Sequence, residues 1–172
     1  INNEPGGMPC HLHGGPEGFN GKVWKADATT EGDTAILHLS YFSADGEMGY
    51  PGSVTATVTY RLTPQNTLEV IYGGETDQTT LLNLTQHSYF NLAGAGACSV
   101  EGHVMQLMAA RFLPTDAGQI PTGAYDDVAG TAFDFTSPAP LGGRWEEDHP
   151  QLKIGNGYDH CWVFDDESNG LK

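Results

Sequence analysis

The sequence predicts an all-β protein built as an antiparallel β-sandwich, and three observations favour this fold class. Apolar and polar residues alternate with a period of two in several segments, which is typical of half-buried strands. No long segment repeats its apolar residues at the 3.6-residue period of an amphipathic helix. The 172 residues include 23 glycines and 10 prolines. This is more than an average globular protein contains, and the excess indicates many turns between short strands.

The clearest strand covers residues 53–62, where threonines alternate with apolar residues. The apolar residues of one face are Val54, Ala56, Val58, Tyr60 and Leu62. The other face carries Ser53, Thr55, Thr57, Thr59 and Arg61. Residues 63–67 read as a turn, and the alternation resumes at Leu68, so residues 53–73 are predicted to form a hairpin.

The remaining elements are shorter or less regular. Residues 35–42 alternate in the same way and are followed by the turn signals Asp45-Gly46 and Pro51-Gly52. Further strands are predicted at residues 79–84, 104–110 and 161–164. Residues 114–130 contain several prolines and glycines and few apolar residues, so a long loop is expected there. We expect residues 1–172 to belong to a single domain.

The charge balance excludes two classes of partner. Seven Lys and Arg residues face 22 Asp and Glu residues, which gives a formal net charge of −15. Phosphate backbones and anionic lipids should repel such a chain, so neither nucleic acid nor a membrane surface is an expected partner. No apolar stretch approaches the roughly 20 residues of a membrane span.

The cysteines indicate the compartment. Cys10, Cys98 and Cys161 are odd in number and far apart, which does not suit a disulfide framework. A reducing, cytoplasmic location is therefore expected.

Histidines are the residues most able to carry chemistry. There are seven, as many as Lys and Arg together, and histidine serves as acid, base or metal ligand near neutral pH. His11 and His13 would share one face of a strand, and with a third ligand they could hold a metal. They could equally contact a polar ligand or be structural. His38, His103 and His149 are interpreted as structural or solvated.

Residues 85–92 interleave polar and aromatic side chains around His87. Sugar sites have this composition because a sugar ring needs hydrogen bonds at its edge and apolar cover on its face. A strand with a satisfied histidine and a buried Tyr-Phe pair would read the same way. Farther along, Asp159 and His160 are adjacent, and adjacent strand residues face opposite ways, so they are not expected to share a site.

Several motifs, in order along almost the whole chain, resemble those of the aldose 1-epimerase (galactose mutarotase) family. They are residues 12–19 (LHGGPEGF) with Trp24, 43–52 (SADGEMGYPG), 83–94 (NLTQHSYFNLAG), 112–114, 120–123, 130–135 and 157–160 (GYDH). The resemblance implies a large antiparallel supersandwich, here incomplete because both ends of the family pattern are missing. It implies an isomerase that interconverts the α and β anomers of free aldohexoses such as galactose and glucose. No metal and no organic cofactor are implied.

The resemblance also assigns roles to residues of this chain. His87 matches the general acid that protonates the ring oxygen, and His13 matches the second catalytic histidine, which holds and polarises the sugar. Both also bind substrate, together with Ser88, Tyr89 and Asp159, whose carboxylate matches one that accepts hydrogen bonds from sugar hydroxyls. His11 receives no role.

Two parts of the family site have no match. The catalytic base of the family is a Glu beyond the end of this chain, and a substrate-binding Asn-Arg pair lies before Ile1; Glu17 and Glu47 are not in the motif of the base. A non-catalytic carbohydrate-binding protein on the same fold therefore remains an alternative, as does a metal-dependent β-barrel enzyme using His11 and His13. The sequence leaves the preferred sugar and the oligomeric state open.

Overall fold

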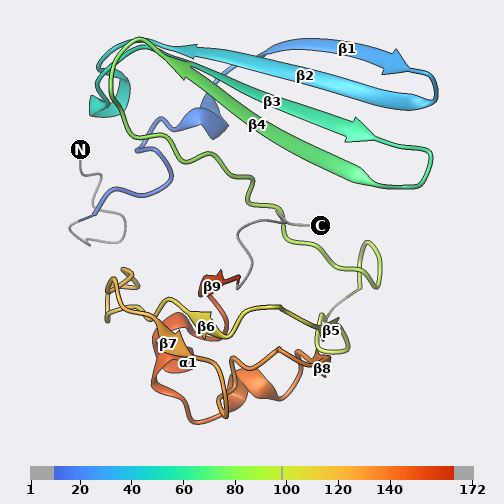
Figure 1. Ribbon diagram of the computed structural model, residues 1–172, viewed down its shortest axis with the longest axis vertical. Coiled ribbons are helices and arrows are strands. Elements are labelled where there is room, and N and C mark those ends of the chain that lie inside the picture. The colour runs from blue at the N-terminus through green and yellow to red at the C-terminus, as the bar shows by residue number, and fades with distance from the viewer. Residues whose placement is uncertain (1–9, 98, 165–172) are drawn as a thin grey trace. The chain divides into compact units, whose positions relative to one another are not determined.

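The computed structural model describes residues 10–97 and 99–164. The chain divides into two compact units, Ile1–His87 and Ser88–Lys172, which are coloured blue to green and green to red in Figure 1. The strand pairs of both units are antiparallel. Helix is limited in the described residues to one short α-helix and three-residue 3-10 turns. The predicted all-β class is therefore confirmed, while the prediction of a single domain stays a prediction.

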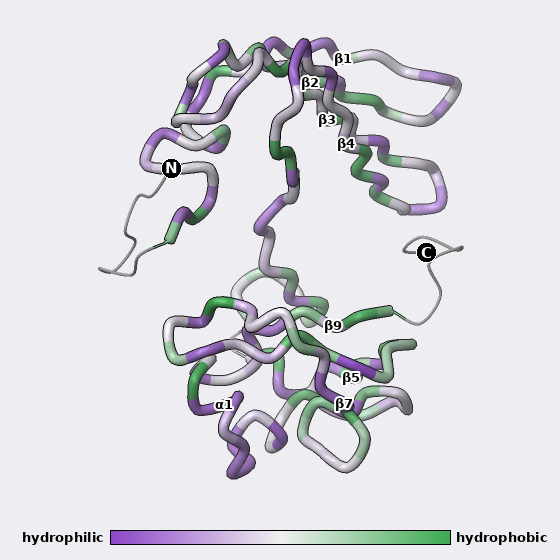
Figure 2. The backbone as a smooth tube through the Cα atoms, turned by 60° about the vertical axis from the view of Figure 1, so that its left-hand side comes forward, coloured by the Kyte–Doolittle hydropathy of each residue, from purple (hydrophilic) through white to green (hydrophobic). Residues whose placement is uncertain are grey.

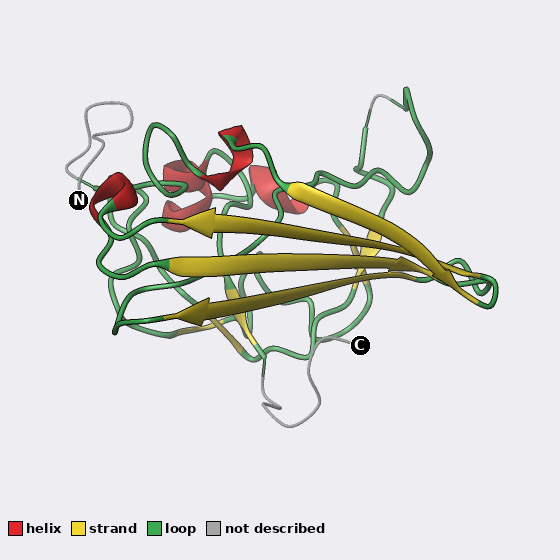
Figure 3. Ribbon diagram, turned by 90° about the horizontal axis from the view of Figure 1, so that it is seen from above, coloured by secondary structure: helices red, strands yellow, loops and turns green. Residues whose placement is uncertain are grey.

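The first unit contains a four-stranded antiparallel sheet. Its strands are β1 (Lys25–Glu31), β2 (Thr34–Ser43), β3 (Val54–Leu62) and β4 (Leu68–Thr76), in the order β1-β2-β3-β4. They are the long yellow arrows of Figure 3. The short 3-10 turns η2 (Phe19–Gly21) and η3 (Glu47–Gly49) lie outside the sheet. The strands predicted at residues 35–42 and 53–62, and the hairpin that follows, are confirmed.

The register gives the sheet one apolar face and one polar face. Directly paired residues point to the same side, so the pairs Leu39↔Val58 and Val58↔Tyr72 place three apolar side chains on one face. On the other face His38 pairs with Thr59. Figure 2 shows hydrophobic and hydrophilic residues mixed along these strands, as expected when one face is covered. Val54, Ala56 and Val58 are buried.

The sequence did not predict β1. All seven of its residues are exposed, and its composition lacks the alternation that marks a half-buried strand. The strand forms because it pairs along its full length with β2, from Lys25↔Ser40 to Glu31↔Thr34. Pairing with a neighbouring strand, rather than burial, determines this element.

The strand predicted at residues 79–84 is wrong. These residues join no ladder in the described part of the chain. The segment instead passes over the sheet at Gly74, where an added Cβ would collide with Leu82 Cδ2. Gly74 pairs with Ala56 on the apolar face, so Leu82 contacts that face from a segment outside the ladder, with 43% of Leu82 still exposed.

In the described residues of the second unit, each strand has two residues. They are β5 (Val104–Met105) paired with β8 (Ala139–Pro140), and β6 (Arg111–Phe112) between β7 (Asp126–Asp127) and β9 (Trp162–Val163). The strands predicted at 104–110 and 161–164 thus exist only in part. The predicted loop at 114–130 is confirmed, apart from β7 and an isolated bridge between Thr115 and Pro121.

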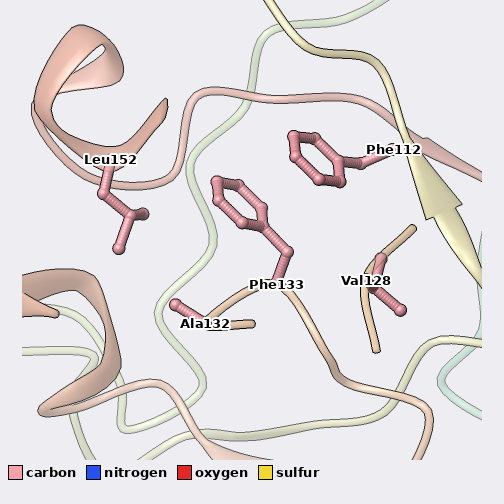
Figure 4. Close-up of a cluster of buried hydrophobic side chains, with 5 residues drawn as sticks. All are labelled: Phe112, Val128, Ala132, Phe133 and Leu152. Atoms are coloured by element: carbon pink, nitrogen blue, oxygen red, sulfur yellow. The ribbon is translucent and has the colours of Figure 1, made fainter. Parts of the chain in front are cut away.

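Aromatic packing holds the second unit together. Figure 4 shows its buried cluster, which consists of Phe112, Val128, Ala132, Phe133 and Leu152. The rings of Phe112 and Phe133 stack with centroids 4.2 Å apart. Tyr158 and Trp162 pack against the cluster and donate hydrogen bonds to the carbonyls of Ala132 (2.8 Å) and Phe133 (3.0 Å). Burial raises the pKa of Tyr158 to about 12, so its hydroxyl stays a donor.

The α-helix of this unit, α1 (Pro150–Gly155), is stabilised at both ends. His149 Nδ1 accepts a hydrogen bond from the Gln151 backbone N–H (3.2 Å), Pro150 occupies the first turn, and Asn156 ends the helix in a left-handed conformation. A helix of six residues is too short to show a 3.6-residue period, which is why the sequence did not reveal it. Across the described residues, no helix has the length and apolar character that a membrane crossing requires.

Candidate active site

The residues that the sequence singled out fall in both units. His13 and His87 lie in the first unit, and Ser88, Tyr89 and Asp159 lie in the second. Each group is described within its own unit.

The structure brings His13 and His87 together. Their ring centroids are 5.6 Å apart and the rings meet edge to face at 85°. Both residues are exposed, although they come from distant parts of the sequence. Two adjacent, exposed imidazoles can contact one small ligand, and each can donate or accept a proton near neutral pH.

A glycine-rich turn positions His13. His13 itself has a left-handed backbone (φ +55°), followed by Gly14 (φ +81°) and Gly15 (φ +93°). The Gly15 N–H donates to the Leu12 carbonyl (3.0 Å) and closes the turn. Gly18 lies so close to the His13 carbonyl oxygen that an added Cβ would collide with it. The Gly-Gly that follows His13 is therefore required by the backbone that carries its ring.

A partly buried carboxylate anchors this segment to the sheet. Glu47, whose side chain is 16% exposed, pairs with Lys22 (Oε1–Nζ 2.9 Å). It also accepts hydrogen bonds from the Tyr41 hydroxyl at 2.8 and 3.1 Å. Burial raises the pKa of Glu47, but hydrogen bonds from Lys22, Ser43 and Tyr41 outweigh this and the net shift is downward. Glu47 is thus an ionised anchor engaged on both oxygens, which agrees with giving it no role as a base.

Aromatic rings pack beside the anchor. Phe19, Trp24 and Tyr41 meet with centroids 5.3 to 6.0 Å apart, and the Trp24 indole N–H donates to the Phe19 carbonyl (3.0 Å). The matched motifs at residues 12–19 and 43–52 are thereby tied to β2. The sequence flagged these motifs only through the family resemblance and did not reveal the Lys22–Glu47–Tyr41 contacts.

His11 does not join His13. Residues 11–13 are not part of a strand, and a turn begins at His13, so the expectation that their side chains share one face of a strand is wrong. His11 is half-buried and meets the Tyr50 ring edge to face at 5.3 Å. Among the described residues, no group of three or more His, Cys, Asp or Glu side chains is arranged to hold a metal ion.

Ser88 and Tyr89 are exposed in the second unit, Tyr89 by 90%. The chain that follows them is held by local hydrogen bonds. The Leu92 N–H donates to His103 Nε2 (2.8 Å), and the Asn91 side chain bridges Ala93 N–H and the Ala97 carbonyl. His103 therefore has a structural contact, in line with its interpretation from the sequence.

Asp159 is exposed, whereas His160 is half-buried against the aromatic cluster. Residues 159 and 160 are not part of a strand, so the alternation on which their expected separation rested does not apply to them. The Asp159 backbone N–H donates to His160 Nδ1 (3.2 Å), and His160 Nε2 lies 3.1 Å from Gln151 Oε1. Gln151 was not recognised from the sequence, because it belongs to the short helix α1.

The family model described as Aldose 1-epimerase matches residues 1–171. The chain belongs to the aldose 1-epimerase family. It is 38% identical over 161 residues to an aldose 1-epimerase of Escherichia coli (strain K12), covering 94% of this chain and 45% of that protein. It is 42% identical over 160 residues to galactose mutarotase of Sus scrofa, covering 93% and 43%. The chain therefore spans a little under half the length of these family members.

Solved structures agree with this family assignment. A galactose 1-epimerase from Lactobacillus acidophilus NCFM superposes with a TM-score of 0.85 at 32% identity, over 92% of this chain and 46% of that one. An aldose epimerase homologue from C. elegans superposes with a TM-score of 0.73 at 28% identity, over 93% and 46%. The predicted galactose mutarotase-like fold is confirmed by these matches.

Proposed function

We propose that the protein is an aldose 1-epimerase that interconverts the α and β anomers of free aldohexoses, galactose and glucose among them. Family membership supports the reaction class. The edge-to-face approach of His13 and His87 at 5.6 Å carries the proposal, because two positioned titratable groups are what ring opening requires.

The reaction opens a hemiacetal, rotates the aldehyde carbon and closes the ring on its other face. Opening needs an acid for the ring oxygen and a base for the proton of the anomeric hydroxyl. We assign the acid to His87 and assign to His13 the task of holding and polarising the sugar. The base, a Glu by the family resemblance, is placed outside these 172 residues. On closure, His87 takes back the proton that it gave to the ring oxygen.

The remaining assignments concern binding. Asp159 accepts hydrogen bonds from sugar hydroxyls. The Ser88 hydroxyl can both donate a hydrogen bond to the sugar and accept one from it, and Tyr89 adds an aromatic face with a polar end. All three are exposed, which supports contact with a ligand. The proposed partner is the sugar alone, without a cofactor. A cytoplasmic location belongs to the same proposal and is supported by the free thiols of Cys10 and Cys161.

The test is the mutarotation rate of α-D-galactose and α-D-glucose, followed by polarimetry in the protein as its gene encodes it. His87→Gln should lower kcat by roughly 10² to 10⁴-fold, the usual effect of losing a general acid. His38→Gln is the matched control, because His38 is also exposed but lies on β2, where its Nδ1 is 2.9 Å from Thr59 Oγ1 of β3. The rate of this variant should equal that of the wild type.

Two outcomes would count against the proposal. A wild-type rate for His87→Gln would overturn the acid assignment. A wild-type protein that binds galactose without exceeding the spontaneous rate would be a carbohydrate-binding protein on this fold, and not an epimerase.

A further inference from the structure

A chain of hydrogen bonds leads from the interior of the second unit to the backbone of Asp159. It begins with the Gln151 side-chain amide, which pairs with the backbone of Thr115. Gln151 Nε2 donates to the Thr115 carbonyl (2.9 Å), and Oε1 accepts from the Thr115 N–H (2.8 Å) and hydroxyl (3.3 Å). These contacts fix which end of the amide is oxygen.

The orientation of Gln151 fixes the tautomer of His160. Gln151 Oε1 can only accept, so the His160 Nε2 that lies 3.1 Å from it must carry the proton. His160 Nδ1 then presents a lone pair and accepts the backbone N–H of Asp159 (3.2 Å). The neutral imidazole is the one form that satisfies both contacts.

Tight packing holds the His160 ring in place. The ring meets Phe133 and Phe112 edge to face, with centroids 4.8 and 5.8 Å apart. On another side, a Cβ added to Gly155 would lie 2.9 Å from His160 Cε1, so the ring packs closely against α1 at a position without a side chain. The imidazole is therefore in contact with both the aromatic cluster and α1.

The charges around His160 are few. Burial lowers its pKa, the carboxylate of Asp159 opposes this shift, and His149 at the start of α1 adds to it. Among the described residues, the ring also meets Gln151, Phe112 and Phe133, none of which is charged. Protonation would place a hydrogen on Nδ1, facing the Asp159 N–H, and would break that contact.

We propose that His160 is a positioning residue for Asp159, which orients the sugar-binding carboxylate through its backbone N–H and releases it when the imidazole is protonated. This inference rests on the proposed function, since it gives Asp159 a sugar to bind. It requires no contact between His160 and the sugar. The expected consequence is a KM that rises on the acid side, while kcat changes little.

The experiment compares three variants of the protein as its gene encodes it. His160→Phe keeps an aromatic ring but removes both nitrogens. It should raise KM for galactose roughly three- to tenfold, the range expected for one hydrogen bond, and leave kcat within about twofold. His160→Asn offers an amide oxygen near the position of Nδ1 but cannot titrate. It should restore KM toward the wild-type value and remove the rise of KM at low pH.

His149→Asn is the matched control. His149 is the second histidine that meets Phe133 edge to face (5.2 Å), and Asn preserves its capping role at α1. This variant should keep the wild-type KM near neutral pH and keep a rise of KM on the acid side, because His160 still titrates; loss of the His149 charge should move that rise slightly upward in pH. If His160→Phe acted only by disturbing the packing of this cluster, then His149→Asn should raise KM in the same way.

Amide hydrogen exchange at Asp159 provides a readout that does not need activity. The Asp159 N–H should be protected near neutral pH, lose protection on acidification, and exchange faster in His160→Phe but not in His160→Asn or His149→Asn. Unchanged exchange in His160→Phe overturns the inference, as does faster exchange with an unchanged KM in an active enzyme. An inactive wild type would defeat the proposed function, and exchange alone would then decide whether His160 holds Asp159.

Discussion

Long strand ladders hold the first unit together, whereas a cluster of aromatic side chains, most of them packed edge to face, holds the second. In the first, β2, β3 and β4 pair over nine or more residues. In the second, each strand has two residues, and Phe133 meets several rings, including those of Phe112 and Trp162. A glycine-rich turn positions His13, while Asp159 contacts His160, whose ring packs on the aromatic cluster. Substitutions that remove a packed side chain should therefore lower the free energy of unfolding more in the second unit than in the first.

The largest expected effect is that of Phe133→Ala. Phe133 is fully buried at the centre of the aromatic cluster, and removing such a ring leaves a cavity that costs about 3–5 kcal/mol. Phe42→Ala removes the same group from β2, where the ring is 63% exposed, and should change the free energy of unfolding by less than about 0.5 kcal/mol. Urea denaturation of both variants measures the difference. Equal losses would refute the contrast between the units.

A smaller effect is expected where the segment that leads to His87 crosses the sheet. Gly74→Ala would push its Cβ into the Cδ2 methyl of Leu82, and because Leu82 is 43% exposed and can shift, the expected cost of overpacking is at the low end, about 1 kcal/mol. Leu82→Ala removes the obstacle, so the cost of Gly74→Ala should largely disappear in that background. A double-mutant cycle on the free energy of unfolding measures this coupling.

Gly73→Ala serves as the control for this cycle. A Cβ at Gly73 meets Thr57 Oγ1 at 2.6 Å, on the opposite, polar face of the same strand. Its cost should be independent of Leu82→Ala. If Gly73→Ala and Gly74→Ala couple equally to Leu82, then Leu82 does not pack on one face of β4 as described.

The smallest effect is the response of each unit to pH. The pKa of His160 is lowered below its usual 6.5 by burial, so the unfolded chain binds more protons than the folded one just below pH 6.5. The stability of the second unit should therefore fall as the pH drops from 6.5 toward the folded pKa. In the first unit, the net lowering of the pKa of Glu47 from 4.5 moves the corresponding loss to below pH 4.5.

Amide exchange as a function of pH, followed separately for residues of β3 and of the aromatic cluster, measures the two windows. His160→Asn should flatten the response of the second unit near pH 6 and leave the first unchanged. Simultaneous loss of protection in both units above pH 5 would contradict the assignment of the windows to His160 and Glu47.

The sequence predicts what depends on local pattern and misses what depends on tertiary contacts. Alternation located β2 and β3 because one face of each strand is covered. It missed β1, which is exposed along its length and exists only through pairing with β2. It misread residues 79–84, where Leu82 contacts the sheet at Gly74 but the segment joins no ladder. In the second unit, strands of two residues carry no period at all.

The candidate site divides in the same way. Family motifs singled out His13 and His87, and the structure brings their rings together. Motifs could not reveal that Gln151 contacts His160, because α1 is too short to leave a signal in the sequence. They could not reveal its pairing with Thr115 either, because 36 residues separate the two. Nor could spacing show that Glu47 is already engaged by Lys22 and Tyr41.

The turn beneath His13 has a consequence for how tightly a ligand can bind. Its left-handed residues and the close approach of Gly18 to the His13 carbonyl hold the loop in one conformation. Fixing a backbone residue costs roughly 1–2 kcal/mol of conformational entropy, and here folding has already met that cost. A ligand that contacts His13 therefore meets a preorganised loop and loses little affinity to ordering it.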